Sequence, residues 1–129
     1  MSYGKEQLRA VYELGRMYFE MGFFVPAERI FAGLAAVDAG TTAARLGLGL
    51  LKLERGLFQE STVYFRAALQ ANTFPLEAKL GLVAAFIGLG EHPRARSLLG
   101  EVARDIQAQP NIDAEVRTLA EAFAERCQG

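Results

Sequence analysis

The chain has 129 residues, of which 51% are hydrophobic and 22% are charged, and its formal net charge at pH 7 is −1. This length is that of one domain with a sizeable core, and the composition excludes intrinsic disorder. The near-neutral charge argues against a surface for nucleic acid or for an anionic membrane, so we expect no nucleic-acid partner.

The chain also lacks the patterns of export and membrane insertion. The N-terminal stretch carries Lys5, Glu6 and Arg9 where a signal peptide needs an apolar run. The longest uncharged apolar stretch, residues 80–90, is too short to span a bilayer. We therefore expect a cytoplasmic protein without membrane insertion.

Apolar residues at helical spacing predict six helices in three consecutive pairs. The pairs cover residues 5–21 with 24–37, 41–55 with 58–71, and 76–89 with 93–107. Gly22, Gly56 and Gly90 each follow a first helix, where a left-handed residue ends it at low cost. Pro26 and Pro93 fall in first turns of second helices, where a missing N–H is tolerated.

A seventh helix is predicted at the C-terminus, running to about Arg126. Asn111 or Asp113 would cap its start. It carries Val116, Leu119 and Phe123 on one face. A terminal helix with one apolar and one polar face is suited to cover the end of a stack of helices.

The helix pairs share a period of 34 residues. This period separates Gly22, Gly56 and Gly90, and it also relates three further sets: Leu14, Leu48 and Leu82; Ala27, Ser61 and Ala95; Phe31, Phe65 and Leu99. The first unit reads Leu14-Gly15, then Tyr18, Gly22, Ala27 and Phe31. This pattern resembles the tetratricopeptide repeat. The resemblance implies an all-α solenoid in a single domain, residues 1–129, with repeats at about 8–41, 42–75 and 76–109 and a capping helix at about 111–127.

Several positions depart from the repeat pattern. The position for a large aromatic residue holds Val11, Arg45 and Lys79. In the second unit, Lys52 stands in the tyrosine position and Ser61 in the alanine position, and in the third unit Val83 replaces the glycine of the Leu-Gly pair.

The stretch "LGLGLLKLERG", residues 46–56, combines glycines with leucines at helical spacing. On a helical wheel, one apolar stripe holds Leu46, Leu50 and Leu53, and an almost opposite stripe holds Ala44, Leu48 and Leu51. A surface helix has one such stripe, so this helix is expected to be covered on two sides. Gly47 recurs one period later as Gly81, and both are expected beside a groove face that they widen into pockets.

The tetratricopeptide resemblance implies a concave groove lined by the first helix of each unit. The family's groove positions are Arg9, Tyr12, Arg16 and Phe19 in unit one, Ala43, Leu46, Leu50 and Leu53 in unit two, and Glu77, Leu80, Ala84 and Ile87 in unit three. Leucines stand where related domains carry a basic clamp for a carboxylate, so we predict an apolar, extended peptide as the ligand. The alternative is that these leucines seal against neighbouring helices or against the last helix folding back.

Residues with catalytic or metal-binding chemistry are sparse. His92 lies in a turn without a second ligand type, and Cys127 lies at the C-terminus without an activating neighbour. Arg9, Glu13, Arg16 and Glu20 form helical charge pairs, which we interpret as a solvated face. No nucleophile–base constellation or phosphate loop is present, so we expect no enzyme, no metal and no cofactor.

Residues 18–69 are similar to the class II chaperones of bacterial type III secretion, which hold translocator proteins before export. The resemblance lies in Tyr18, Gly22, Ala27 with Phe31, Asp38, Leu46-Gly47-Leu48-Gly49, Gly56, Phe58 and Phe65. It implies a chaperone that keeps an apolar translocator segment soluble. Two alternatives stay open: a needle-subunit chaperone that holds a helix, and an adaptor in a pilus or envelope assembly complex. A homodimer is also left open, because an open apolar groove or the N-terminal helix would favour self-association.

Overall fold

A computed structural model describes residues 4–37, 41–72, 74–109, 111 and 114–127. This part of the chain is all-helical, with seven helices and no strand: α1 Lys5–Glu20, α2 Phe24–Ala35, α3 Thr41–Glu54, α4 Phe58–Gln70, α5 Pro75–Gly88, α6 His92–Ala108 and α7 Ala114–Cys127. Each helix expected from the sequence is present, with ends displaced by only a few residues.

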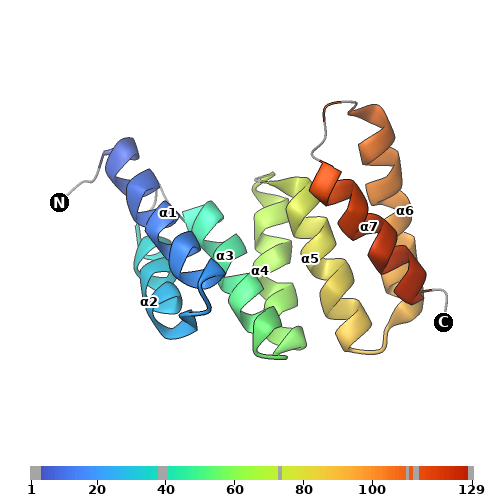
Figure 1. Ribbon diagram of the computed structural model, residues 1–129, viewed down its shortest axis with the longest axis horizontal. Coiled ribbons are helices and arrows are strands. Elements are labelled where there is room, and N and C mark those ends of the chain that lie inside the picture. The colour runs from blue at the N-terminus through green and yellow to red at the C-terminus, as the bar shows by residue number, and fades with distance from the viewer. Residues whose placement is uncertain (1–3, 38–40, 73, 110, 112–113, 128–129) are drawn as a thin grey trace.

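The helices form one elongated stack in chain order, and the two termini lie at opposite ends of its long axis (Figure 1). Each helix packs on the next one along the chain. In addition, α1 contacts α3, α3 contacts α5, and α5 contacts α7. The odd-numbered helices therefore form one continuous layer, and α2, α4 and α6 pack against it as a second layer.

The turn within each pair repeats closely. Gly22, Gly56 and Gly90 have φ of +85°, +73° and +75°, as expected. The Gly56 N–H donates to the Leu53 carbonyl at 3.0 Å, and the Leu57 N–H donates to the Lys52 carbonyl at 2.9 Å. This pair of bonds is the Schellman motif, which satisfies the last carbonyls of the helix and needs a left-handed residue. The turns at Gly22 and Gly90 have the same two bonds.

The core divides at α3. Ala44, Leu48 and Leu51 belong to a cluster that includes Leu8 and Phe31 of the N-terminal pair. Leu46, on the opposite side of the same helix, belongs to a second cluster around Phe65 and Leu82. The expectation that α3 is covered on two sides is confirmed. Its two apolar stripes tie consecutive helix pairs together.

Two phenylalanines of the outer layer are wedged between helices at glycines. A Cβ built on Gly15 or on Gly47 would lie 2.8 Å from a carbon of the Phe31 ring. In the same way, a Cβ built on Gly49 would lie 2.8 Å from a carbon of the Phe65 ring, and one built on Gly81 would lie 2.5 Å from it. Both rings are buried, with exposures of 1% and 0%.

This packing corrects the role predicted for Gly47. We expected Gly47 to widen a groove, but its missing side chain faces the Phe31 ring. The glycines make room for an aromatic ring from the outer layer, because a methyl group at that position would overlap the ring. The penalty of a glycine in a helix interior is offset by the close approach of α2 to α3.

The third unit shows the complementary change. Leu99 stands one period after Phe65, and Val83 stands one period after Gly49. Both are buried in the same cluster. Leu99 is smaller than Phe65 and leaves space in the core, and Val83 is larger than Gly49 and fills that space. The departure from the repeat pattern at Val83 therefore follows from the volume of the core.

Other departures from the repeat pattern take polar partners. The Lys52 ammonium lies 3.6 Å from Glu28 on α2 and 3.5 Å from Glu60 on α4. The Lys79 ammonium lies 2.7 Å from Asp105 on α6. The hydroxyl of the buried Ser61 donates to the Phe58 carbonyl at 2.7 Å. The contacts of Lys52 and Lys79 join neighbouring helices. The hydrogen bond of Ser61 satisfies a buried hydroxyl, as buried polar groups require.

The last helix, α7, packs on α5 and α6. Phe123 contacts the Phe65 cluster and also a smaller cluster of Leu80, Val102 and Ile106, which Ala120 also covers. The side chains of Val116 and Leu119, and the residue Asp113, lie outside the described residues. Phe123 is thus the described part of the predicted capping face. Among the described residues, no helix has the length and apolarity needed to cross a membrane.

Candidate functional site

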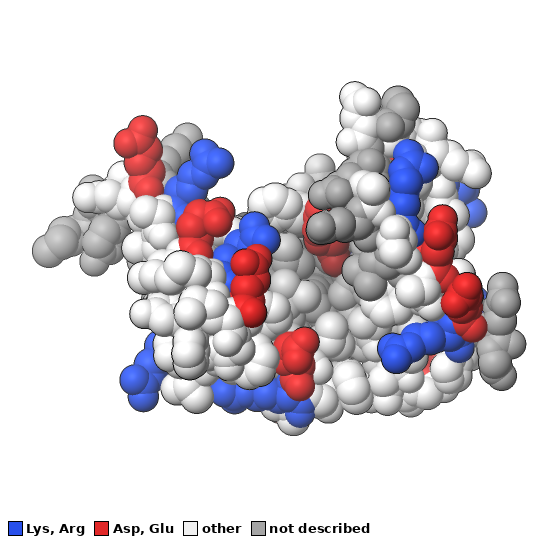
Figure 2. Space-filling model, in the orientation of Figure 1, with Lys and Arg blue, Asp and Glu red and all other residues white. Residues whose placement is uncertain are grey.

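The odd-numbered helices enclose a cavity of about 950 Å³. Its lining comprises Leu8, Arg9, Tyr12, Glu13 and Arg16 of α1, Leu34 of α2, Ala43, Leu46, Leu50 and Leu53 of α3, Phe74, Glu77, Leu80, Gly81 and Ala84 at and within α5, and Phe123 of α7. Figure 2 shows the surface hollowed between the N-terminal helices and the α6–α7 end, with most charged side chains on the flanks. We call this cavity the groove.

Most residues predicted from the sequence come together in the groove. Tyr12, Arg16, Leu46, Leu50, Leu53, Leu80, Ala84 and Gly81 line it, as do Arg9, Ala43 and Glu77. The three helices present these residues to the same space because their positions repeat every 34 residues.

Three predicted residues do not line the groove. Phe19 packs against the N-terminal core, with its ring 5.5 Å from that of Phe24. Ile87 packs against the Phe65 cluster. Gly47 is buried beneath Phe31. Each lies on its helix where a neighbouring helix covers it, so the groove is shorter than the repeat positions alone indicated.

Two leucines on the floor of the groove are more deeply buried than expected. Leu46 is 5% exposed and Leu80 is 4% exposed, although we expected both to face water in an open groove. Leu50 and Leu53 are half-buried. The alternative prediction, that groove leucines seal against neighbouring helices, thus describes Leu46 and Leu80, while Leu50 and Leu53 offer surface to a ligand.

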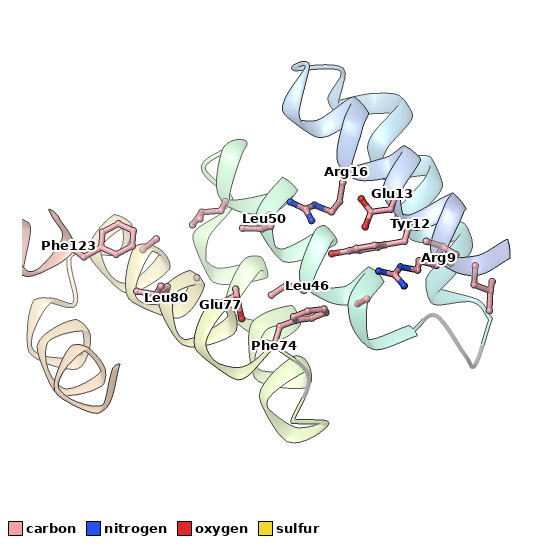
Figure 3. A pocket seen from close by; sticks show the side chains of 16 residues that line it. Arg9, Tyr12, Glu13, Arg16, Leu46, Leu50, Phe74, Glu77, Leu80 and Phe123 are labelled. Carbon is pink, nitrogen blue, oxygen red and sulfur yellow. The ribbon is translucent and has the colours of Figure 1, made fainter. Parts of the chain in front are cut away.

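Several lining residues were not expected from the sequence, notably Leu8, Glu13, Leu34, Phe74 and Phe123. Phe74 is 46% exposed and adopts a left-handed conformation, with φ of +45°, directly before Pro75. Its side chain projects towards Leu46 and Tyr12 at the rim (Figure 3). Phe123 closes the other end from α7. Neither belongs to a repeated position, so no periodic signal marks them.

The α1 wall of the groove is charged. Arg9, Glu13 and Arg16 project from α1 towards the α3 leucines, and Glu77 projects from α5 (Figure 3). Arg16 pairs with Glu20 at 3.3 Å, and both side chains are more than half exposed, so the pair is weak. The helical charges that we interpreted as a solvated face therefore include three that border the groove.

Tyr12 lies between the charged wall and the apolar floor. Its ring packs on that of Phe31, with centroids 5.7 Å apart and planes at 49°. Burial raises the pKa of the Tyr12 hydroxyl above its ordinary value, with Glu13 and Glu77 adding to the rise and Arg16 opposing it. At neutral pH the hydroxyl is protonated and is able to donate a hydrogen bond into the groove.

The groove combines an apolar floor with a polar rim. Its leucine floor offers apolar contact, and its rim offers two arginines, two glutamates and a tyrosine hydroxyl. Within the described residues, no group of three histidine, cysteine, aspartate or glutamate side chains is arranged to hold a metal ion. His92 lies at the start of α6 and does not line the groove, and its buried Nδ1 atom has no hydrogen-bond partner among the residues that the structure describes.

Comparison with known protein families, with curated proteins and with solved structures yields no match to this chain.

Proposed function

We propose that this chain is a tetratricopeptide-type solenoid that binds a segment of another protein in its groove. The observation that carries the proposal is the cavity of about 950 Å³, which has an apolar floor and a polar rim. Ligand pockets in proteins have this character and reach about 1,000 Å³. The 34-residue period and the three recurring Schellman turns support the tetratricopeptide assignment.

The chemistry of the rim favours an extended segment over a helical one. Arg9, Arg16, Glu77 and the Tyr12 hydroxyl border the apolar floor. An extended segment presents free backbone N–H and C=O groups that such side chains bind, and its alternate side chains would contact Leu50 and Leu53. The backbone groups of a helix are already hydrogen-bonded to one another, so a helical ligand would use the rim less well.

The resemblance of residues 18–69 to class II secretion chaperones suggests which segments to test first. On this proposal, the ligand is an apolar segment of a type III secretion translocator, and binding in the cytoplasm keeps that segment soluble before export. The chain would act through binding alone, without catalysis. A needle-subunit chaperone and an adaptor in an envelope or pilus complex are the alternatives, and they differ in the segment that each would hold.

An array of overlapping 12-residue peptides from translocators and from needle subunits tests the proposal. Each fluorescein-labelled peptide is titrated with the full-length protein, and binding is followed by fluorescence anisotropy. Leu53→Glu places a charge on the groove surface and serves as the negative control. Val63→Glu, at a 64% exposed site on α4, serves as the matched charge control.

The proposal expects translocator peptides with alternating apolar residues to bind the wild type and Val63→Glu, but not Leu53→Glu. Binding restricted to the needle-subunit peptides would support the needle-chaperone alternative. Absence of binding to every peptide would leave the adaptor alternative. Binding that Leu53→Glu leaves unchanged would refute the groove as the site.

A further inference from the structure

The charged side chains of the groove are distributed unevenly among its helices. Arg9, Ala43 and Glu77 occupy the same repeat position in α1, α3 and α5, because 34 residues separate each from the next. All three line the groove. At this position α1 thus carries a positive charge and α5 a negative one, with alanine between them. A segment that lies across the three helices would meet opposite charges towards its two ends.

Glu77 is the carboxylate of the groove that has no basic neighbour on its own helix. On α1, Glu13 has Arg9 and Arg16 one helical turn away on either side, which offsets its charge. On α5, the positions one turn from Glu77 hold no charged residue. Among the described residues, Glu77 forms no ion pair. Its exposed carboxylate is therefore open to a cation from a ligand.

Two aromatic rings border the same part of the groove. Phe74 is the N-cap of α5 and Glu77 is the third residue of that helix. Side chains at these two positions lie on the same face of a helix start. The ring of Phe74 projects from there towards Leu46 and Tyr12 (Figure 3).

Tyr12 approaches this place from the other wall. The pKa of its hydroxyl is raised by burial in the first place, and the charges of Glu13 and Glu77 add to the rise. The Glu77 carboxylate on α5 thus lies within electrostatic range of a hydroxyl on α1. Tyr12, Phe74 and Glu77 therefore border one region of the groove, which we call the cation subsite.

The chemistry of the cation subsite matches a basic side chain. A carboxylate accepts charge-assisted hydrogen bonds from an ammonium or a guanidinium group. The faces of phenylalanine and tyrosine rings attract the same cations, and the neutral Tyr12 hydroxyl is able to accept a further hydrogen bond. The apolar stem of lysine or arginine would lie on the leucine floor.

We propose that the groove selects segments that contain a lysine or arginine and holds this side chain in the cation subsite. The inference rests on the proposed function and names a residue class that the ligand must contain. Glu77 supplies the charge, and the rings of Phe74 and Tyr12 border the cation. Arg9 and Arg16 repel a cation at the α1 wall, so the basic residue also sets the direction in which the segment lies.

Fluorescein-labelled 12-residue peptides of alternating leucine and serine test the cation subsite. In one set, lysine replaces each serine in turn. In matched sets, arginine, acetyl-lysine or glutamate stands at the same position. Each peptide is titrated with the full-length protein and followed by fluorescence anisotropy. The proteins are the wild type, Glu77→Lys, Phe74→Leu and, as the matched charge reversal on the α1 wall, Glu13→Lys. Circular dichroism reports whether each variant is folded.

The proposal expects the wild type to bind the lysine and arginine peptides at least about 5-fold more tightly than the acetyl-lysine peptide, at one position or two adjacent ones. At that position Glu77→Lys should invert the preference, so that the glutamate peptide binds more tightly than the lysine peptide. Glu13→Lys should keep a preference for lysine. Phe74→Leu should reduce that preference about 2-fold, because the ring is lost.

Two results would overturn the cation subsite and leave the proposed function intact. One is binding of the unsubstituted peptide without a preference for lysine or arginine at any position. The other is an inversion in Glu13→Lys as complete as that in Glu77→Lys, which would show that the preference comes from the overall field of the groove. If the wild type binds none of the peptides, the proposed function fails together with the subsite.

Discussion

A Cβ atom on Gly81 would lie 2.5 Å from two carbons of the Phe65 ring, closer than real side chains approach. Phe65 lies on α4 and Gly81 on α5, and a Cβ atom on Gly49 of α3 would also lie 2.8 Å from the ring. The ring thus joins two helices of the inner layer, and α1 and α3 are joined in the same way around Phe31. Because these helices line the groove, the glycine–phenylalanine contacts set its spacing.

The first prediction follows from this contact. Gly81→Ala gains about 1 kcal/mol of helix propensity but overpacks the Phe65 ring at a cost of about 1–3 kcal/mol. We expect a net loss of stability, measured by urea denaturation. Gly33→Ala is the matched control, because nothing lies within 4 Å of its Cβ position in α2, and it should stabilise the protein.

A double-mutant cycle checks the mechanism. Phe65→Leu replaces the ring with leucine, the residue that stands one period later as Leu99. Without the ring, Gly81→Ala should lower the stability by less than it does in the wild type. Additive costs would mean that ring overlap does not cause the loss.

A second prediction separates folding from binding on α3. Leu48 is 7% exposed in the N-terminal core, so Leu48→Glu buries a charge at a cost of several kcal/mol and should unfold the domain. Leu53 lines the groove and belongs to no core cluster, so Leu53→Glu should cost under about 1 kcal/mol. Circular dichroism melts compare the two. A folded Leu48→Glu beside an unfolded Leu53→Glu would contradict the assignment of the two faces.

The third prediction concerns Phe74. A side chain at φ of +45° is strained by about 1–2 kcal/mol, and nearly half of this one is exposed. Phe74→Gly should therefore raise the melting temperature or leave it unchanged, while weakening peptide binding if the ring contacts the ligand. Leu57→Gly is the control, because Leu57 is 39% exposed at φ of −88° and lies outside the groove. It should lower the melting temperature and spare binding.

The fourth prediction is a pH dependence. The folded state raises the pKa of Tyr12 above 10.0, because burial disfavours the ionised form. Above pH 10 the unfolded chain therefore loses a proton that the folded chain keeps, and the stability supplied by neutral Tyr12 falls as pH rises. Tyr12→Phe should flatten the fall of stability above pH 10. Absorbance at 295 nm should show one fewer late-titrating tyrosine, and identical titrations would contradict the burial.

The fifth prediction tests α7 as a cap. Phe123 contacts two core clusters, so Phe123→Ala should destabilise the protein by about 1–3 kcal/mol and lower its melting temperature by several degrees. Truncation after Gln109 should have a larger effect and promote aggregation, which light scattering would detect. A truncated protein that stays monomeric and equally stable would show that α7 is not a cap.

The local elements of this fold were predictable from the sequence. Helix starts and ends depend on residues within a few positions, such as Gly56 with its left-handed φ or Pro93 in a first turn. The 34-residue period also placed Arg16, Leu50 and Ala84 on one surface, because equivalent positions of stacked units face the same way. Helix ends are thus set within a short segment, and the period is legible along the chain without knowledge of the contacts between helices.

The tertiary structure alone decided what each side chain meets across the gap between helices. Periodicity placed Gly47 and Ile87 near the groove. In the structure, Phe31 covers Gly47, and Ile87 packs against the cluster around Phe65. Phe74 and Phe123 reach the groove from outside the repeated positions. Contacts of this kind depend on side-chain volumes on separate helices, and the sequence around any one residue does not encode the volume of its distant neighbour.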